Sequence, residues 1–149
     1  MIVLAWVVAT ALFDLLRPTG KNILASDELA LETAVNISLF TDRRADDSDD
    51  LPAGADRRGY WGDAFAEVDG DLVGSRLWLL ERMGRDDALK NAPIFAKEAL
   101  AWMLVDGVAS SVTATADELG PRVLRLTVSI ERPGVVGRWV RFWEVRYGV

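Results

Sequence analysis

Apolar residues occupy every second position over residues 124–130, and shorter runs with the same period of two cover residues 112–116 and 139–145. Gly-Pro at 120–121 and Pro-Gly at 133–134 separate the three runs and supply residues suited to turns. We therefore predict a C-terminal antiparallel meander of three strands. The middle run alternates cleanly, so one face of the sheet should contact the core and the other should face water.

The pattern changes to a helical period upstream of the meander. Residues Ser26–Phe40 place apolar side chains on one face, and Ser26 is suited to cap the first turn. Residues Asp86–Val105 place apolar side chains around most of the circumference, which predicts a helix at the centre of the core. Asp86 is the expected cap of this helix, and Pro93 predicts a kink or a fresh first turn.

A third, shorter helix is predicted over Arg76–Met83, with Ser75 as its cap and a glycine at its end. Its apolar residues should face the core and leave Arg76 on the rim. Together these patterns predict an α+β fold in which two to three helices pack on a mostly antiparallel sheet. The length of 149 residues predicts a single domain over residues 1–149.

The N-terminal part of the chain is uncharged from Met1 to Phe13. This run is shorter than the roughly 20 residues that a membrane-spanning helix needs. Because it is rich in Val, Ile and Trp, we interpret Ile2–Val8 and Leu12–Leu16 as two short strands or one bent strand. A signal peptide is the alternative interpretation, although no Lys or Arg opens the run.

Residues Asp42–Asp71 show little periodicity and contain several glycines and a proline, which predicts a long irregular loop. Its first part, Asp46–Asp50, has the acidic density of a calcium loop but fails the EF-hand template, so we interpret it as a solvated, mobile tip. Its second part, Arg57–Phe65, places three aromatic residues among glycines. We predict that this second part is ordered and binds a partner.

The last predicted strand has apolar residues on both faces. Val140 and Phe142 point one way, whereas Trp139, Trp143 and Tyr147 point the other. Two apolar faces on a terminal strand indicate contact with a second protein. Packing beneath the N-terminal strands is an equally good interpretation.

Composition excludes several classes of function. The net charge of −6 argues against a nucleic-acid partner, because no basic face is evident. The absence of Cys and His removes the commonest catalytic base and metal ligands, so we expect neither a metal nor a cofactor. Glycoside hydrolysis needs only two carboxyl groups, and the acids nearest predicted order are Asp63, Glu67, Glu81 and Glu98. Their spacing singles out none of them, so we expect no catalytic residue.

Several blocks of the sequence resemble a known family. In chain order they are LETAVNISLFTDRRA (31–45), DDLPAG (49–54), RRGYWGD (57–63), GSRLWLLER (74–82) and KEALAWMLVDGVA (97–109), followed by the strand meander. The chain resembles the Mu-type phage tail family of small baseplate proteins. Through that family it is similar to the lysozyme-like sheath-initiator subunits of contractile tails. The resemblance runs from about Phe13 to Ile130.

The resemblance implies a structural role without catalysis. It implies a baseplate wedge subunit that binds larger wedge proteins and tail sheath, spike or hub proteins, and that helps to initiate sheath assembly. Multiple copies in a sixfold assembly are also implied. The implied location is the tail of the virion, after assembly in the host bacterial cytoplasm, with no membrane partner.

We expect the partner-binding residues in the aromatic part of the loop, in the short helix after it and in the last strand. They are Arg57, Arg58, Tyr60, Trp61, Asp63, Arg76, Trp78, Trp139, Trp143 and Tyr147. Strand addition, through residues 138–147 or the N-terminal strand, is a second expected mode of binding. Two other functions stay open: a peptidoglycan-degrading lysozyme-like enzyme, and a soluble regulatory binding protein of the anti-adapter type.

Overall fold

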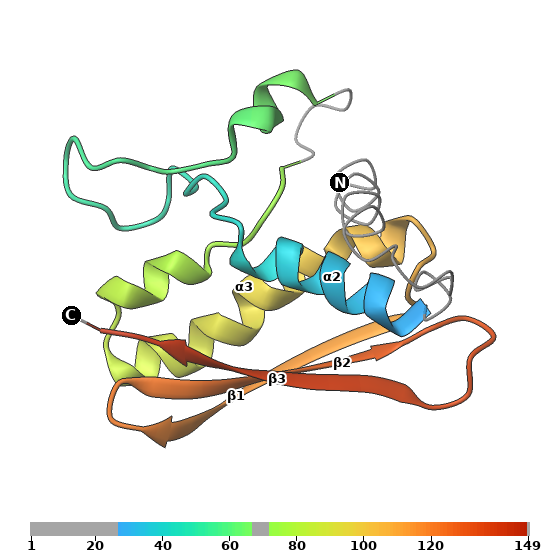
Figure 1. The fold of residues 1–149 in the computed structure, drawn as a ribbon. Helices are drawn as coiled ribbons and strands as arrows, with labels where there is room; N and C mark the ends of the chain where they lie inside the picture. Colours follow the sequence, from blue (N-terminus) through green and yellow to red (C-terminus); the bar gives the residue numbers. More distant parts are fainter. Residues whose placement is uncertain (1–26, 67–71, 149) are drawn as a thin grey trace, which may run out of the picture.

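The computed structural model of the chain describes residues 27–66 and 72–148. The helical elements in this part are α2 (Asp27–Phe40), the 3-10 helices η2 (Trp61–Phe65) and η3 (Leu77–Arg82), and α3 (Arg85–Val105). The strands are β1 (Ser111–Gly120), β2 (Val123–Glu131) and β3 (Arg138–Arg146). Figure 1 shows the helices gathered on one side of the sheet, which confirms the predicted α+β class. The strands predicted over Ile2–Val8 and Leu12–Leu16, and the cap at Ser26, lie outside the described residues.

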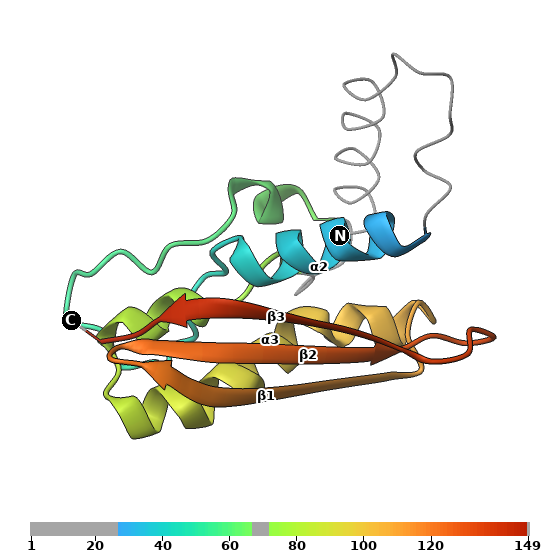
Figure 2. The same ribbon diagram turned by 60° about the horizontal axis from the view of Figure 1, so that its bottom comes forward.

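The predicted meander is confirmed. The sheet has the order β1-β2-β3, and both pairs are antiparallel (Figure 2). In β2 the side chains of Leu124, Leu126, Val128 and Ile130 are fully buried, whereas the residues between them are half-buried or exposed. Burial of each aliphatic side chain contributes roughly 1.5–3 kcal/mol, so this row fixes which face of the sheet is the inner one.

The helices form a layer on that inner face. α3 packs on β1 and β2, and α2 lies beside α3 and over β3, where Trp143 Nε1–H donates to Asn36 Oδ1 at 3.0 Å. The buried residues of α3 recur at helical spacing and are Ala88, Ala92, Phe95, Ala96, Ala99, Leu100 and Met103. The predicted central position of α3 is therefore confirmed. Its apolar residues do not all enter the core, however, because Ile94 and Val105 lie on the uncovered side and are exposed.

The start of α3 differs from the prediction, and the helix continues through Pro93. Gly84, not Asp86, is the N-cap, and its carbonyl accepts the N–H of Ala88 at 2.9 Å. Asp86 lies in the first turn, where a carboxylate is favourable near the positive end of the helix dipole. Pro93 removes one helical hydrogen bond. Burial of the neighbouring Phe95 and the alanine face offsets this loss, so no second helix starts there.

The helix predicted over Arg76–Met83 is a 3-10 helix, and it is not amphipathic. Residues 77–80 are all buried. The N–H of Leu77 donates to Ser75 Oγ at 3.2 Å, which is close to the capping role predicted for this serine. The N–H of Gly148 donates to Leu80 O at 2.9 Å, so η3 lies between α3 and the C-terminal end of the described chain. This enclosure explains why consecutive residues of η3 are buried.

Candidate partner-binding surface

Residues 41–66 form an excursion from the body of the molecule, which we call the arm. Figure 1 shows it leaving the end of α2, running away from the sheet, turning back and ending at η2, at the top of the view. The N–H of Ala45 donates to Arg57 O at 2.9 Å, and Arg57 Nη1 donates to Asp46 O at 2.7 Å. The outgoing and returning halves therefore lie side by side. Apart from η2 the arm has no helix, so the long irregular loop is confirmed over its described part.

The root of the arm is held against the segment that precedes η3. The N–H of Ser75 donates to Thr41 O, and the N–H of Arg43 donates to Ser75 O, each at 2.9 Å. The Ser75 hydroxyl, which is buried, donates to Leu39 O. Gly74 adopts a φ of +99°, and a Cβ at this position would collide with the carbonyl of Thr41. Only glycine permits this close approach of the two segments.

Arg76 binds the acidic part of the arm to the helices. Its guanidinium lies 2.9 Å from carboxylate oxygens of Asp46 and Asp49, and 2.7 Å from Glu98 of α3. It also lies over the ring of Phe95, 4.8 Å from the centroid. Burial acts to lower the pKa of Arg76, but hydrogen bonds to Glu98 and Asp49 outweigh burial and raise it. We refer to Arg76 and its three carboxylates as the clamp.

The contacts in the clamp show that two predictions from the sequence were wrong. Arg76 does not lie on a solvated rim, because its side chain is only 9% exposed. The acidic run is not simply a solvated tip, because Asp49 is 13% exposed and is paired together with Asp46. Asp47 and Asp50 do face solvent. The Arg76 guanidinium and the carboxylates of the arm are far apart in the sequence, so no local pattern predicted that they pair.

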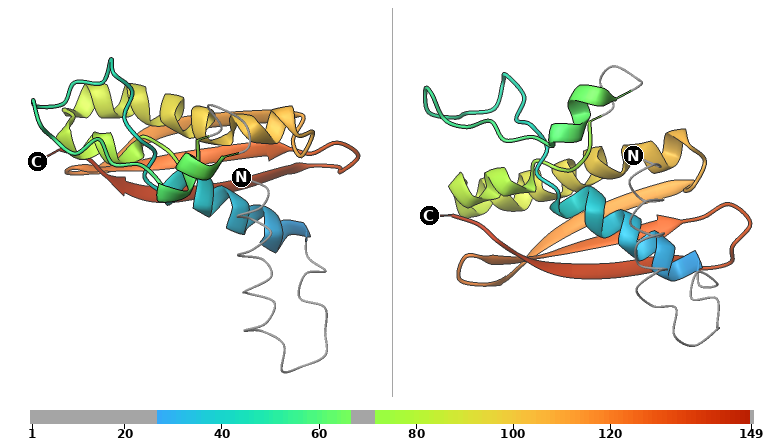
Figure 3. Two further views of the ribbon diagram at one scale, coloured as in Figure 1. Left: turned by 90° about the horizontal axis from the view of Figure 1, so that it is seen from above. Right: turned by 45° about the horizontal axis from the view of Figure 1, so that its top comes forward.

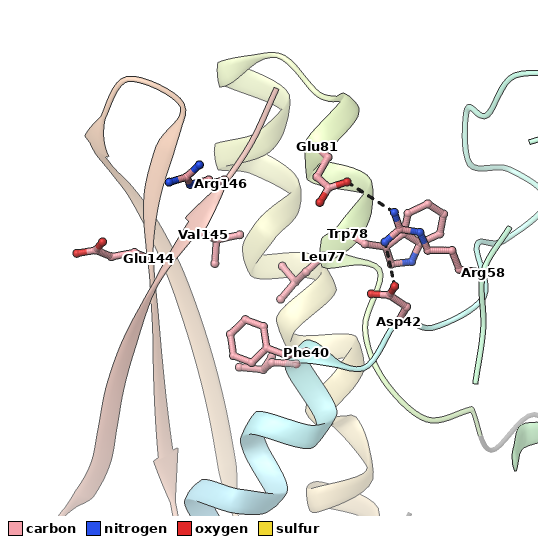
Figure 4. A pocket seen from close by; sticks show the side chains of 10 residues that line it. Phe40, Asp42, Arg58, Leu77, Trp78, Glu81, Glu144, Val145 and Arg146 are labelled. Carbon is pink, nitrogen blue, oxygen red and sulfur yellow. Dashed lines mark hydrogen bonds and ion pairs between the residues drawn. The ribbon is translucent and has the colours of Figure 1, made fainter. Parts of the chain in front are cut away.

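A second arginine stacks between the arm and the body. The Arg58 guanidinium lies 4.4 Å from the centroid of the Trp78 ring, 2.9 Å from Asp42 and 3.7 Å from Glu81 (Figure 4). Trp78 is buried, and its Nε1–H donates to Arg43 O at 2.8 Å. These contacts hold the returning half of the arm immediately before its aromatic residues.

A groove of about 250 Å³ opens beside this stack. Its apolar lining includes Phe40 and Leu77, and its other wall is formed by residues 144–146 of β3 (Figure 4). Side chains of consecutive strand residues point to opposite faces of a sheet. Because all three residues line one groove, the groove meets β3 at its open edge.

The aromatic part of the arm forms an exposed ledge, which consists of Tyr60, Trp61 and Phe65. The ring centroids of Tyr60 and Trp61 are 5.4 Å apart, and those of Trp61 and Phe65 are 6.4 Å apart. Trp61 is 75% exposed and Phe65 is 78% exposed. Asp63 Oδ1 accepts the N–H of Val73 at 3.0 Å, which ties η2 to the segment leading into η3. Large exposed rings on a tethered loop are typical of a protein-binding surface.

The predicted partner-binding residues fall into two groups. Side chains with exposed or partly exposed surface are Arg57, Arg58, Tyr60, Trp61, Asp63 and Trp143, whereas Arg76, Trp78, Trp139 and Tyr147 are buried. In β3 the tryptophans lie beneath α2, so the outward-facing apolar residues are Val140 and Phe142. The buried side chains build the core of this fold and offer no surface to a partner.

Four residues that matter here were not among the predicted site residues. Phe65 ends the same short 3-10 helix that Trp61 begins, and its place among the aromatic residues and glycines of this loop was the available signal for the ledge. Asp46, Asp49 and Glu98 bind Arg76 in the clamp, and the sequence offered no signal that identifies the cation they share.

Comparison with known proteins identifies relatives of the chain in phage Mu and in a Mu-like prophage. The family described as "Phage protein GP46" matches residues 31–136. The chain is 44% identical over 116 residues to "Baseplate protein gp46" of Escherichia phage Mu, which covers 76% of this chain and 77% of the Mu protein. This chain belongs to the GP46 family of Mu-type phage baseplate proteins. A second GP46 relative, "Mu-like prophage FluMu protein gp46" of Haemophilus influenzae, is 35% identical over 119 residues, covering 76% of this chain and 80% of that protein.

The family match locates the candidate surface within the GP46 sequence. Residues 31–136 include the arm, the clamp, the ledge and the first two strands, and they end before β3. The resemblance to a Mu-type baseplate family is thereby confirmed. The contacts that hold the ledge in place therefore belong to the part of the chain that the GP46 family shares.

Three of the four carboxylates considered for hydrolysis have structural partners in this GP46 protein, and one of these is Asp63, which accepts the N–H of Val73. Glu98 binds Arg76, Glu81 lies near Arg58, and Glu67 lies outside the described residues. Within residues 27–66 and 72–148, no group of three or more His, Cys, Asp or Glu side chains is placed to hold a metal ion. In the same part of the chain, no helix has the length and apolar character needed to cross a bilayer.

Proposed function

We propose that this GP46-family protein is a structural subunit in the baseplate of a contractile phage tail or tailocin, where it binds larger wedge proteins and helps to initiate sheath assembly. The name of its phage Mu relative supports the baseplate role. The ledge is the observation that carries the proposal, because Trp61 and Phe65 present most of their surface to solvent. Several copies in a sixfold tail, assembled in the host cytoplasm, complete the proposal.

The ledge can supply a large share of the binding free energy. Burial of one aromatic side chain by a partner contributes roughly 1.5–3 kcal/mol, and contact between aromatic rings adds about 0.5–1.5 kcal/mol. Arg58 and Arg76 already hold the arm, so little conformational entropy is lost when a partner closes over the rings. Binding of this kind needs no bond to be made or broken.

The open edge of β3 supports a second mode of binding. Among the described strands, β3 pairs with β2 and no strand lies along its other side. An extended segment of a partner can add to this edge through main-chain hydrogen bonds, with an apolar side chain in the groove beside Phe40 and Val145. We therefore assign β3 main-chain contacts, whereas the ledge contributes side-chain contacts.

A complementation experiment tests the proposed function. The gene would be replaced in its own tail cluster by Trp61→Ala or Phe65→Ala, with Val136→Ala as a control at an exposed apolar residue of the β2–β3 hairpin. Each purified variant should unfold at the same temperature as the parent protein, because none of these side chains is buried. We expect the ledge variants to yield few or no contractile tails and the control to yield normal numbers.

Normal contractile tails from both ledge variants would count against the ledge as the binding surface. The same proteins would be assayed on cell-wall substrate and for a stable complex with a host factor in cells that make no tails. Hydrolysis of the cell wall would favour the lysozyme-like enzyme, and the complex would favour the regulatory protein.

A further inference from the structure

The side of α3 that faces away from the core has an apolar stripe. Ile94, Leu104 and Val105 are exposed, Val105 to 85%, and Ala101 is also exposed. Ile94, Ala101 and Val105 follow one another at intervals of seven and four residues, so they share one side of the helix. The stripe extends over about 16 Å at the helical rise of 1.5 Å per residue.

Two lysines lie on the same side of the helix. Lys90 is one turn before Ile94 and Lys97 is one turn after it, and both are exposed. Among the described residues neither lysine has an ion-pair partner within 4 Å. Glu98, the next residue after Lys97, is bound by Arg76. Asp87, three residues before Lys90, is also exposed on this side of the helix. From Lys90 onward the face combines apolar side chains with the positive charge of the two lysines, in a chain whose net charge is −6.

The geometry of the face fits a helix better than a strand. All main-chain groups along this part of α3 are inside a helix, so the face offers no open edge for strand addition. Rows of side chains on a helix accept the rows of a second helix at an axial distance of about 8–10 Å, and the small Ala101 permits close approach. In the left view of Figure 3, α2 lies along one side of α3 and no other described helix lies along the opposite side.

We propose that this face of α3 binds an acidic amphipathic helix of another tail protein. The apolar stripe of that helix covers Ile94, Ala101 and Val105, and its carboxylates pair with Lys90 and Lys97. Unpaired lysines select a partner of opposite charge and orient it, while the apolar contacts supply most of the affinity. The proposal rests on the proposed baseplate function, and it adds a second surface that is separate from the ledge.

Chemical labelling of the lysines tests this proposal, because Lys21, Lys90 and Lys97 are the only lysines in the sequence. An amine-acylating reagent would be applied to the free protein and to purified intact tails, and the labelled peptides measured by mass spectrometry. We expect Lys90 and Lys97 to react at least about tenfold more slowly in tails. A carbodiimide, which joins amines to carboxylates in contact, should couple them to Asp or Glu in a helical segment of another tail protein.

A substitution provides an independent readout. Ala101→Glu adds bulk and negative charge in the middle of the stripe, and Ala30→Glu is the matched control at an exposed alanine of α2. Both variants should unfold like the parent protein. We expect Ala101→Glu to be incorporated into tails at no more than about a tenth of the parent level, and Ala30→Glu to be incorporated normally.

Three outcomes would overturn the proposal. The lysines could stay as reactive in tails as in the free protein, or the carbodiimide could couple them to residues 1–26 of the same chain or to the acidic arm of a second copy. Absence of the chain from purified tails would overturn the proposed function as well. The two failures are therefore distinguishable, because labelling is read only from tails that contain the chain.

Discussion

Replacement of Arg76 by Met is expected to release the arm and destabilise the protein. The substitution removes the one cation of the clamp and leaves Asp46, Asp49 and Glu98 close together with no opposite charge between them. Arg76→Lys keeps the charge but loses the planar fork that binds several carboxylates at once, so its effect should be intermediate.

The structure allows the size of this effect to be worked out. Breaking a buried ion pair by removal of one partner costs about 3–5 kcal/mol. Water screens part of this cost, because the side chains of Asp46 and Glu98 are 46% and 37% exposed. Asp49 is the least exposed partner, so water screens its unpaired charge least. We therefore expect a loss of about 3 kcal/mol in the free energy of unfolding. In a chain of this size that loss lowers the unfolding midpoint by roughly 6–12 °C.

Thermal unfolding followed by circular dichroism measures the predicted loss, and limited trypsin digestion at Arg57 and Arg58 reports on release of the arm. Arg85→Met is the matched control, because Arg85 forms an exposed ion pair with Glu118, and water screens such a pair so that it contributes little to stability. The reasoning is refuted if Arg76→Met unfolds no earlier than Arg85→Met and its arm is digested no faster than in the parent protein.

Three further predictions concern other parts of the molecule. Gly74→Ala should lower the free energy of unfolding, measured with a chemical denaturant, by about 2 kcal/mol or more, because the φ of +99° and the contact with Thr41 O exclude a Cβ. A loss below about 0.5 kcal/mol would contradict the close packing at the root of the arm. Leu126→Ala, at a fully buried position of β2, should cost about 2–5 kcal/mol in the same assay, and a near-neutral result would mean that β2 is not central to the core. The pKa of Glu118 is lowered by its hydrogen bond from Arg85, so its stabilising contribution is present above its usual value of 4.5 and is lost as pH falls through the lowered pKa. Between neutral pH and about pH 3, Glu118→Gln should therefore show a smaller fall in unfolding midpoint than the parent protein, and equal falls would refute the linkage.

Local patterns were sufficient to predict the three strands and the two α-helices, but they did not predict the 3-10 helix η2. The alternation of Leu124 to Ile130 identified β2 because one row of side chains is buried along the whole strand. The helical period identified α2 and α3 for the same reason, since one side of each helix packs against a neighbour. The position of Gly84 as the cap of α3 was missed because Asp86 is a better cap in isolation, and its side chain instead pairs with Arg85.

The site was harder to predict because long-range pairing creates it. From the sequence alone the Asp46–Asp50 run is predicted to be a solvated tip. The arginine that pairs with it, Arg76, lies 27 residues beyond Asp49, so no local pattern connects the two. In β3 both faces are apolar in the sequence, and only the position of α2 decides that Trp139 is buried and Phe142 exposed. The ledge was the part that local sequence could indicate, because aromatic residues next to glycines are informative within one loop.

The central claim is that the ledge is buried against another tail protein in the assembled particle. A reconstruction of intact tails by electron cryo-microscopy measures this directly. We predict that Trp61 and Phe65 both lose most of their exposed surface to a neighbouring polypeptide. Rings that face solvent in the assembled tail, or tails from which the chain is absent, would contradict the account.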